Sequence, residues 1–437
     1  MTLFGIAWRN IRQRALTSCL TALSLALGVA LVVATLVTAG IVKQAFNSGA
    51  GLGYNMIAGA KGSPLQLVLN SVYLISRPIE NVSWAFYEQF LPAENRRDGQ
   101  AGTFAGSVKT AVPICMGDYF RGHRVVGTNA AYFDRLSYGN GQPFAFAAGE
   151  NFRDADFFGG VLGADAARTL GLKVGDAFSP THGADNGLVH DPFVVRGVLA
   201  RTDTPVDRGV YVNMEGFYLQ EGHAKPVEGV EPPEKQKPTE TATGQPTPLP
   251  PEQREVTAIL VETAALPGLP PELMAMGLKQ AINEGRDGQA AEPIREIRQL
   301  LDLFVRPLEL LLLLVTVLVV VVSAIGILVS MVGSALERSR DVAVMRALGA
   351  RRGHVLATVL IEAILLAVGG GLAGWALGHA VVAAIGPLIT TGAGVTASFF
   401  STSPAELLLV PFLVGLAILA ALLPALSAYR TDVSRWL

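Results

Sequence analysis

The sequence ERSRDVAVMRALGARRGHV, residues 337–355, lies between two long apolar runs. It holds five arginines and two acidic residues in nineteen positions, and its apolar residues recur at helical spacing. A short, basic, amphipathic segment between apolar runs is typical of a cytoplasmic loop in a membrane protein, because positively charged loops stay on the cytoplasmic side. The stretch therefore predicts membrane spans on both sides of it.

Four apolar runs reach the length of about 20 residues that a transmembrane helix needs. They occupy residues 17–42, 307–333, 355–385 and 406–429. The first run is much longer than the apolar part of a signal peptide, about 7–15 residues, so we expect an uncleaved span. The composition agrees, because only 16% of the residues are charged, against about 25% in soluble domains.

Arginines set the expected orientation. Arg9, Arg12 and Arg14 precede the first run, five arginines lie between the second and third runs, and the loop 386–405 has no charged residue. The positive-inside rule predicts a multi-pass protein of the inner membrane with cytoplasmic termini and a periplasmic domain. The expected cytoplasmic parts are an amphipathic helix at 1–16, a short helix at 334–354 and a tail at 430–437; the expected outer parts are a domain at 43–306 and a loop at 386–405.

The expected outer domain carries 30 acidic and 24 basic residues, an ordinary surface chemistry. Alternating and β-branched runs predict strands, whereas apolar residues at helical spacing predict helices at 65–75, 165–170 and 271–284. The predicted strands include 54–60, 192–200, 208–214 and 256–262. The fold class expected is an α-helical membrane protein of four spans, with a large mixed α+β domain inserted between the first and second spans. A helical segment at 292–306 should lead directly into the second span.

Residues 225–254 differ from the rest of this domain. They contain eight prolines and few apolar residues. Such a segment buries too little surface to offset the entropy of ordering, so we expect a disordered insertion.

Enzyme motifs are absent from the sequence. No phosphate-binding G-x-x-x-x-G-K-[ST], no zinc-protease H-E-x-x-H and no G-x-S-x-G is present. The six histidines form no ligand-spaced pair on one helix, so no metal site is predicted. His182 and His190 flank a loop, and they are read either as a metal pair or as solvated loop residues. The net charge of -2 argues against nucleic acid as a partner.

A few residues in and near the spans are candidates for function. Lys61, Gly62 and Ser63 form a turn that would bind a phosphate or a lipid headgroup, or that simply joins a strand to a helix. Glu362 lies within the third span, where an ionised carboxylate facing lipid is costly, so we expect it to face other helices. Small residues recur every four positions in the same span, at Gly370, Gly374 and Gly378, and this spacing lets another helix approach closely.

Several segments of the chain resemble the MacB/FtsX-like family of ABC transporter permeases, which includes LolC and LolE. The segment IAWRNIRQRALTSCLTALSLALGVAL (6–31) is similar to the first span of the family and the helix before it. VLGADAARTLGLKVGDAF (161–178) looks like a signature turn of the outer domain, and LPALSAYRTDV (423–433) like the closing segment. Residues 337–378, which include the opening stretch, carry the most specific likeness.

The resemblance implies that the helix at 334–354 couples the permease to a separate ATPase subunit. The implied contact residues are Arg338, Arg340, Asp341, Val342, Met345, Arg346, Leu348 and Gly349. Val342, Met345 and Leu348 would form a small apolar face suited to a groove, with arginines at its edges. The alternative is a basic loop that only fixes the topology.

The implied mechanism is mechanotransmission, in which the second span carries movement from the ATPase to the outer domain. It implies two copies of an ABC ATPase that bind ATP and Mg, a second permease protomer that completes a homodimer, membrane lipids and a periplasmic partner protein. This chain itself would bind no cofactor. The expected substrate is a lipoprotein, lipid, peptide or small amphiphile of the envelope.

Two other functions stay open. One is a signalling scaffold like FtsX, which activates an extracytoplasmic partner such as a cell-wall hydrolase without transport. The other is a membrane-anchored binding protein that works without an ATPase. Two features depart from the best-known members. We expect no fused ATPase domain, since these residues hold no ATPase motif, and residues 54–73 match neither the macrolide-exporting nor the lipoprotein-releasing branch.

Overall fold

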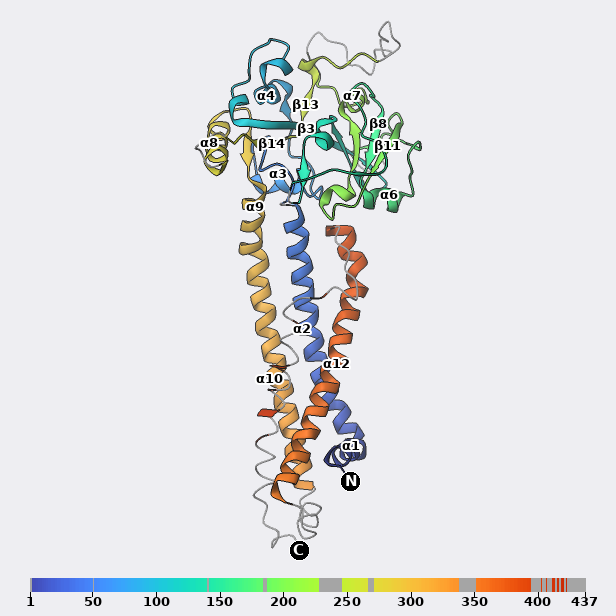
Figure 1. Ribbon diagram of the computed structural model, residues 1–437, viewed down its shortest axis with the longest axis vertical. Helices are drawn as coiled ribbons and strands as arrows, with labels where there is room; N and C mark the ends of the chain where they lie inside the picture. The colour runs from blue at the N-terminus through green and yellow to red at the C-terminus, as the bar shows by residue number, and fades with distance from the viewer. Residues whose placement is uncertain are drawn as a thin grey trace. The chain divides into compact units, whose positions relative to one another are not determined.

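The computed structural model describes residues 2–49, 51–139, 141–183, 187–227, 246–265, 271–337 and 351–393, together with isolated positions between 402 and 422. The chain folds into two compact units (Figure 1). The helical unit consists of Met1–Lys43 and Asp302–Leu437, and the β-rich unit consists of Gln44–Leu301. The expected combination of apolar helices with a large mixed α+β domain is confirmed.

Long helices make up the described part of the helical unit. They are α1 (Leu3–Gln13), α2 (Ala15–Gly49), α10 (Arg306–Glu337) and α12 (Arg352–Ala393). Within the described residues, three stretches are long and apolar enough to cross a membrane: Ala15–Gln44, Pro293–Gly326 and Gly353–Gly386. The expected fourth span, 406–429, lies almost entirely outside the described residues. Helix α12 continues through Pro387 to Ala393, so residues 386–393 of the expected outer loop are helical, in a stretch with no charged residue.

Apolar side chains of α2 and α12 form the core of the helical unit. Leu25, Val29 and Val33 of α2 pack with Ala363 and Ala367 of α12, and all five are buried. The pairing of branched side chains on one helix with small ones on the other is typical of close helix packing in membranes.

A mixed sheet of eleven strands forms the centre of the β-rich unit. Nine strands follow the order β15-β1-β14-β3-β4-β12-β8-β11-β7, and β10 and β9 pair with β3 and β11 outside this order. The strands are β1 (Met56–Gly59), β3 (Val108–Phe120), β4 (His123–Thr128), β7 (Phe146–Gly149), β8 (Gly159–Leu162), β9 (Ala177–Phe178), β10 (Thr181–His182), β11 (Phe193–Leu199), β12 (Val210–Asn213), β14 (Ala258–Thr263) and β15 (Gln289–Ala291). The pairs β4–β12 and β8–β11 are parallel, whereas the other pairs are antiparallel.

Each face of this sheet has its own core, because successive side chains of a strand point to opposite faces. On β14, Ile259 and Val261 belong to one buried cluster, and Leu260 belongs to the other. Tyr211 of β12 likewise lies on the face opposite to Val210 and Val212. The central strands are therefore buried on both sides, which explains why they read as continuous apolar runs rather than as alternating ones.

Short helices cover both faces of the sheet (Figure 1). They are α3 (Pro64–Ser71), α4 (Trp84–Glu88), α5 (Ala131–Asp134), α6 (Ala164–Leu170), α7 (Met214–Tyr218), α8 (Pro271–Glu284) and α9 (Pro293–Leu300). Short 3-10 turns and two small ladders complete the unit: η1 (Ala93–Asn95), η2 (Ala105–Ser107), η3 (Pro205–Arg208), η5 (Pro251–Gln253), β2 (Val82–Ser83) with β13 (Glu255–Val256), and β5 (Ser137–Tyr138) with β6 (Gln142–Pro143).

The segment predicted as a disordered insertion, 225–254, is packed at both described ends. The backbone N–H of Lys225 donates to the carbonyl of Gln253 over 2.8 Å, and Leu249, Gln253 and Arg254 are buried. The prediction is therefore wrong for residues 246–254. The prediction failed because Leu249 and Arg254 make tertiary contacts, and a count of prolines does not reveal such contacts. The middle of the segment, 228–245, lies outside the described residues.

The chain passes from the β-rich unit into the membrane-spanning α10 without leaving helical structure. Helix α9 ends at Leu300, a π-helical turn η6 covers Leu301–Val305, and α10 begins at Arg306. The predicted helical lead from 292 to 306 is present, and the π turn is an addition that the sequence pattern did not indicate.

Candidate functional site

The residues expected to contact an ATPase lie outside the described part of the chain. They are Arg338, Arg340, Asp341, Val342, Met345, Arg346, Leu348 and Gly349. The described structure ends with α10 at Glu337 and resumes at Arg351, directly before α12. Their role in coupling stays a prediction.

The three glycines of α12 lie against the backbone of α2. A Cβ atom at Gly370 would come within 2.8 Å of the carbonyl oxygen of Ala22, and one at Gly378 within 2.8 Å of the Cβ of Val33. A Cβ at Gly374 would overlap the carbonyl oxygen of Ala26. The absence of side chains at these positions allows the two helices to touch along this line.

Two polar contacts lie among the apolar helices. Glu362 of α12 is buried and accepts a hydrogen bond of 3.5 Å from the side-chain amide of Asn10 on α1. His379 is also buried, with its Nε2 atom 2.9 Å from a carboxylate oxygen of Glu406, which accepts a second bond from the indole of Trp375. Polar groups at this depth are held by partners on other segments rather than exposed to lipid.

The turn formed by Lys61, Gly62 and Ser63 joins β1 to α3. Ser63 is the N-cap of α3, and its hydroxyl accepts from the backbone N–H of Gln66. The ammonium of Lys61 donates to the carbonyl of Asn283 over 3.3 Å. These contacts are those of a strand-to-helix connection, one of the two alternatives that the sequence left open.

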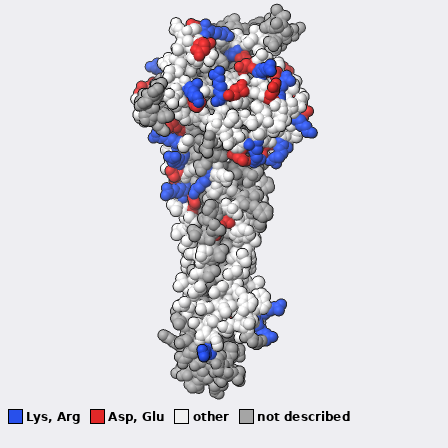
Figure 2. Space-filling view, viewed as in Figure 1, with Lys and Arg blue, Asp and Glu red and all other residues white. Residues whose placement is uncertain are grey.

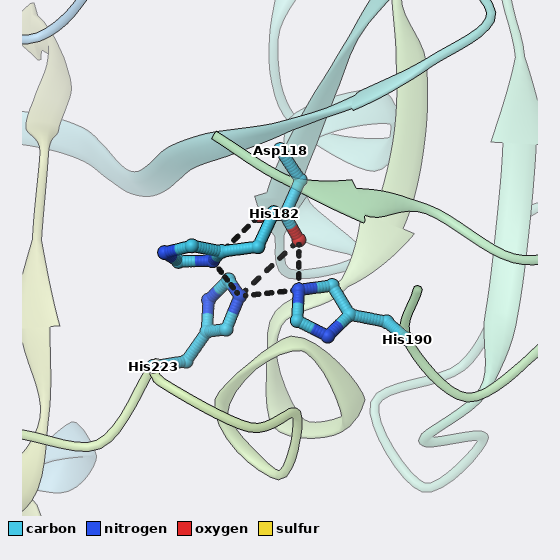
Figure 3. A group of neighbouring side chains, drawn as sticks. All are labelled: Asp118, His182, His190 and His223. Carbon is cyan, nitrogen blue, oxygen red and sulfur yellow. Dashed lines mark hydrogen bonds and ion pairs between the residues drawn. The ribbon is translucent and has the colours of Figure 1, made fainter. Parts of the chain in front are cut away.

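The structure brings together a group of titratable side chains in the β-rich unit that the sequence analysis did not predict to be neighbours. Figure 3 shows Asp118, His182, His190 and His223 pointing toward one another, and we call these four residues the His–Asp cluster. Each offers one donor atom, and the four donor atoms lie within 4.8 Å of one another.

The sheet aligns the first two members of the cluster. In the antiparallel pair β3–β10, His182 lies directly opposite Asp118. On its other side β3 pairs with β4, and the register of that pair shifts between Met116 and Tyr119. This irregularity is typical of a β-bulge, which redirects the side chains at the bulge, and Asp118 lies within it.

Two loops bring the other two members to the same place. The segment after β10 folds back, since His182 donates its backbone N–H to Leu188 and His190 donates its own to Pro180. Gly222, with φ of 86°, adopts a left-handed conformation in the turn that follows α7 and carries His223. The side chain of Gln220 fastens this turn to the hairpin by accepting from the backbone N–H of Asp191 over 2.8 Å.

Burial controls the ionisation of the cluster. Asp118 is 0% exposed, and burial acts to raise its pKa; the imidazoles of His190 and His223 outweigh this effect and lower the pKa to about 2. Burial also lowers the pKa of His223, against an opposing effect of Asp118. The carboxylate is therefore ionised, and the His223 ring is favoured in its neutral form, which keeps a lone pair on one nitrogen.

The structure corrects the sequence interpretation of the two loop histidines. His190 is 5% exposed, so the reading of solvated loop residues is wrong for it, because the hairpin turns its ring inward. The prediction of no metal site rested on a search for ligand spacing within one helix, and such a search could not bring together four donors from a strand and separate loops. The sequence does contain one signal that could have brought His182 and His190 together. Asp185-Asn186-Gly187, a typical hairpin-turn sequence, lies between them. No local signal pointed to Asp118 or His223.

Comparison with known families accounts for both units of the chain. Residues 313–433 match the FtsX-like permease C-terminal domain. Residues 18–241, more than half of the chain, match the MacB-like periplasmic core domain. The chain belongs to the MacB/FtsX-like family of ABC transporter permeases. Domains of such permeases are not enzymatic, in agreement with the lack of enzyme motifs in this sequence.

Curated relatives of this permease are macrolide export ATP-binding/permease proteins named MacB. The protein of Neisseria meningitidis serogroup A is 36% identical over 85 residues, which cover 20% of this chain and 13% of the relative. The protein of Chlorobium luteolum is 31% identical over 141 residues, 29% of this chain and 21% of the relative. The alignments thus span a small part of these longer proteins.

All four residues of the His–Asp cluster lie within the part of the permease that matches the MacB-like periplasmic core domain. The cluster also lies in the β-rich unit and not in the helical unit.

Proposed function

We propose that this chain is the permease subunit of an ABC transporter that works by mechanotransmission. ATP hydrolysis by a separate ATPase, which binds the ATP and Mg, drives export, extraction or release of an envelope substrate. The substrate class is a lipoprotein, lipid, peptide or small amphiphile. The working assembly contains two permease protomers and two ATPase subunits in the inner membrane, with the termini in the cytoplasm and the β-rich unit in the periplasm.

The main support is the helical run that joins the two units. Ile297 of α9 is 2% exposed and packs in one of the two cores of the β-rich unit. The start of this run is fixed further by the ion pair of 3.0 Å between Lys279 and Glu292. From Pro293 to Glu337 the chain stays helical through η6. A continuous helical run that is packed into one unit and forms an apolar span in the other is suited to carry force between them.

A second contact joins the two spans that connect to the β-rich unit. The ammonium of Lys43 on α2 lies 2.7 Å from a carboxylate oxygen of Glu309 on α10. Glu309 is only partly exposed, with 19% of its side-chain surface accessible. This ion pair supports a common movement of α2 and α10 rather than an independent one.

Helix α10 offers a surface for a second protomer. The most apolar window of its span is only 12% buried, compared with 56% for α2. Large exposed side chains on it include Leu308, Leu311, Leu314, Leu318 and Val322. On the face that Figure 2 shows, uncharged residues cover most of the described part of the helical unit, whereas charged residues gather on the β-rich unit. This surface fits lipid on one side and a partner span on the other.

Purification from native membranes tests the proposed coupling. We would tag the chain, purify it in detergent, identify co-purified proteins by mass spectrometry and measure ATP hydrolysis. The test variant is Met345→Glu with Arg346→Glu, and the control is Arg9→Glu on the exposed face of α1. We expect an ATPase with the wild type and the control, and none with the test variant. If no sample contains an ATPase, residues 334–354 are only a basic loop and the proposal is wrong.

The same preparation separates transport from signalling. A transporter should retain a lipid, lipoprotein or other amphiphile whose amount falls when ATP is added. A scaffold of the FtsX type should instead retain a soluble extracytoplasmic protein, and its activity should change with ATP while no envelope component is released.

A further inference from the structure

The His–Asp cluster has the composition and the geometry of a metal site. We propose that Asp118, His182, His190 and His223 together bind one Zn²⁺ ion in the β-rich unit. The ligand atoms are one carboxylate oxygen, Nδ1 of His182 and Nε2 of His190 and His223. This site is independent of the coupling to an ATPase.

The distances between the donor atoms match a tetrahedron around zinc. Zinc lies about 2.0–2.1 Å from histidine nitrogen and about 2.0–2.2 Å from carboxylate oxygen, so ligand atoms at the corners of a regular tetrahedron are about 3.3–3.4 Å apart. Four contacts among such donor atoms have nearly this length: Oδ2 of Asp118 to His190 (3.3 Å) and to His223 (3.2 Å), His182 to His223 (3.3 Å), and His190 to His223 (3.1 Å). His182 lies 3.3 Å from the other carboxylate oxygen, Oδ1.

A network of hydrogen bonds alone explains these contacts poorly. Charge-assisted bonds from imidazolium to carboxylate are short, about 2.7–2.9 Å, whereas the three histidine contacts to Asp118 are 3.2–3.3 Å. Among the described residues, neither carboxylate oxygen of Asp118 has a partner in hydrogen-bond geometry. A buried carboxylate needs partners of good geometry, and a bound cation would supply one in addition to the three imidazoles.

The donor set favours zinc over other common ions. Calcium and magnesium take six or more oxygen ligands, but this site offers three imidazole nitrogens and one carboxylate. Tetrahedral coordination by such ligands is typical of Zn²⁺, and four protein ligands close the coordination shell. The site would therefore hold its ion structurally. It would fasten the hairpin at 181–190 and the turn at 219–223 to the bulge in β3.

The ion has a route to the site from solvent. The side chain of His182 is 46% exposed, whereas those of Asp118 and His190 are 1% exposed. Three ligands are thus held within the fold and one lies at the surface. Replacement of His182 should therefore remove a ligand without opening the core.

Metal analysis of the full-length protein in detergent tests this proposal. The chain would carry a tag without histidines, be stripped with EDTA, be incubated with zinc sulfate and be desalted before elemental analysis. We expect one zinc ion per wild-type chain, and loss of the ion in His182→Ala and Asp118→Asn. His182→Cys should restore binding, because cysteine is also a zinc ligand. His123→Gln is the matched control and should bind like the wild type, since His123 lies outside the cluster, with its Nδ1 3.0 Å from the carbonyl of Arg208.

Two further readouts guard against misfolded variants and adventitious binding. Zinc should raise the melting temperature of the wild type and of His123→Gln, but not that of His182→Ala, because only a folded chain with an intact site gains from binding. Cobalt in place of zinc should give the strong visible absorption of four-coordinate Co²⁺. Equal zinc content in the wild type, His182→Ala and Asp118→Asn would overturn the proposal. A six-coordinate cobalt spectrum in the wild type would overturn it as well.

Discussion

Arg254 and Glu215 form a bidentate ion pair within the β-rich unit. The Nη1 and Nη2 atoms of Arg254 each lie 2.8 Å from a different carboxylate oxygen of Glu215. The guanidinium also lies over the ring of Trp84, at 5.0 Å, and its Nε atom donates to the carbonyl of Leu249. This arrangement fixes the far end of the segment 225–254 to helix α7.

Loss of this ion pair should destabilise the β-rich unit. Arg254 is buried, with 6% of its side-chain surface exposed, so Glu215→Gln leaves an unpaired charge in the interior. Breaking a buried pair in this way costs about 3–5 kcal/mol. We expect a lower denaturation midpoint in urea for the full-length protein in detergent. Glu262→Gln is the control, because it breaks the more exposed pair with Lys109 and should cost less than about 1 kcal/mol. Equal effects of the two changes would contradict this assignment.

The glycines of α12 should differ sharply in their tolerance of a methyl group. Gly374→Ala places a Cβ against the carbonyl of Ala26, so α2 and α12 must separate. Overpacking of this kind costs about 1–3 kcal/mol. Gly369→Ala is the matched control, because a Cβ there meets nothing within 4 Å. We expect a lower melting temperature in detergent for Gly374→Ala only, and similar melting temperatures for both variants would show that the helices do not touch there.

The thiol of Cys115 should make the β-rich unit less stable in alkali. Burial raises its pKa from an ordinary value of 9.0 to about 12, against an opposing hydrogen bond with Tyr218. The folded thiol therefore keeps its proton between pH 9 and 12, while the thiol of the unfolded chain ionises. The unfolded state binds fewer protons in this window, so stability falls as the pH rises, by about 1 kcal/mol between pH 9 and 10.

Urea denaturation at several pH values measures this contribution. Cys115→Ala should lose this part of the alkaline slope, whatever its stability at neutral pH. Cys19→Ala should keep the slope of the wild type, since Cys19 lies in α2, outside the β-rich unit. A Cys115→Ala variant with the slope of the wild type would refute the assignment.

Elements with a strong local pattern could be predicted from the sequence. The helix predicted at 271–284 has these bounds in the structure, and the strand predicted at 192–200 corresponds to β11, Phe193–Leu199. In both cases the periodicity and the flanking prolines determine the element. The family was also predictable, because residues 6–31 and 337–378 keep their pattern of charges and small residues within a single stretch.

The His–Asp cluster was not predictable, because its geometry depends on pairing between distant strands. Asp118 and His182 become neighbours only through the β3–β10 pair, and β10 has two residues, too few to show an alternating pattern. The burial of Arg254 escaped prediction for a similar reason. Its partner Glu215 is far away in sequence, so the local sequence around Arg254 offered only prolines, which suggested disorder.

The π turn at Leu301–Val305 interrupts the α-helical repeat between α9 and α10. Each residue of an α-helix advances the side-chain direction by about 100°, and a π turn contains more residues than an α turn. A helical wheel with 100° per residue therefore loses its phase at this turn. The apolar pattern of α9 cannot be extended to assign which residues of α10 share a face.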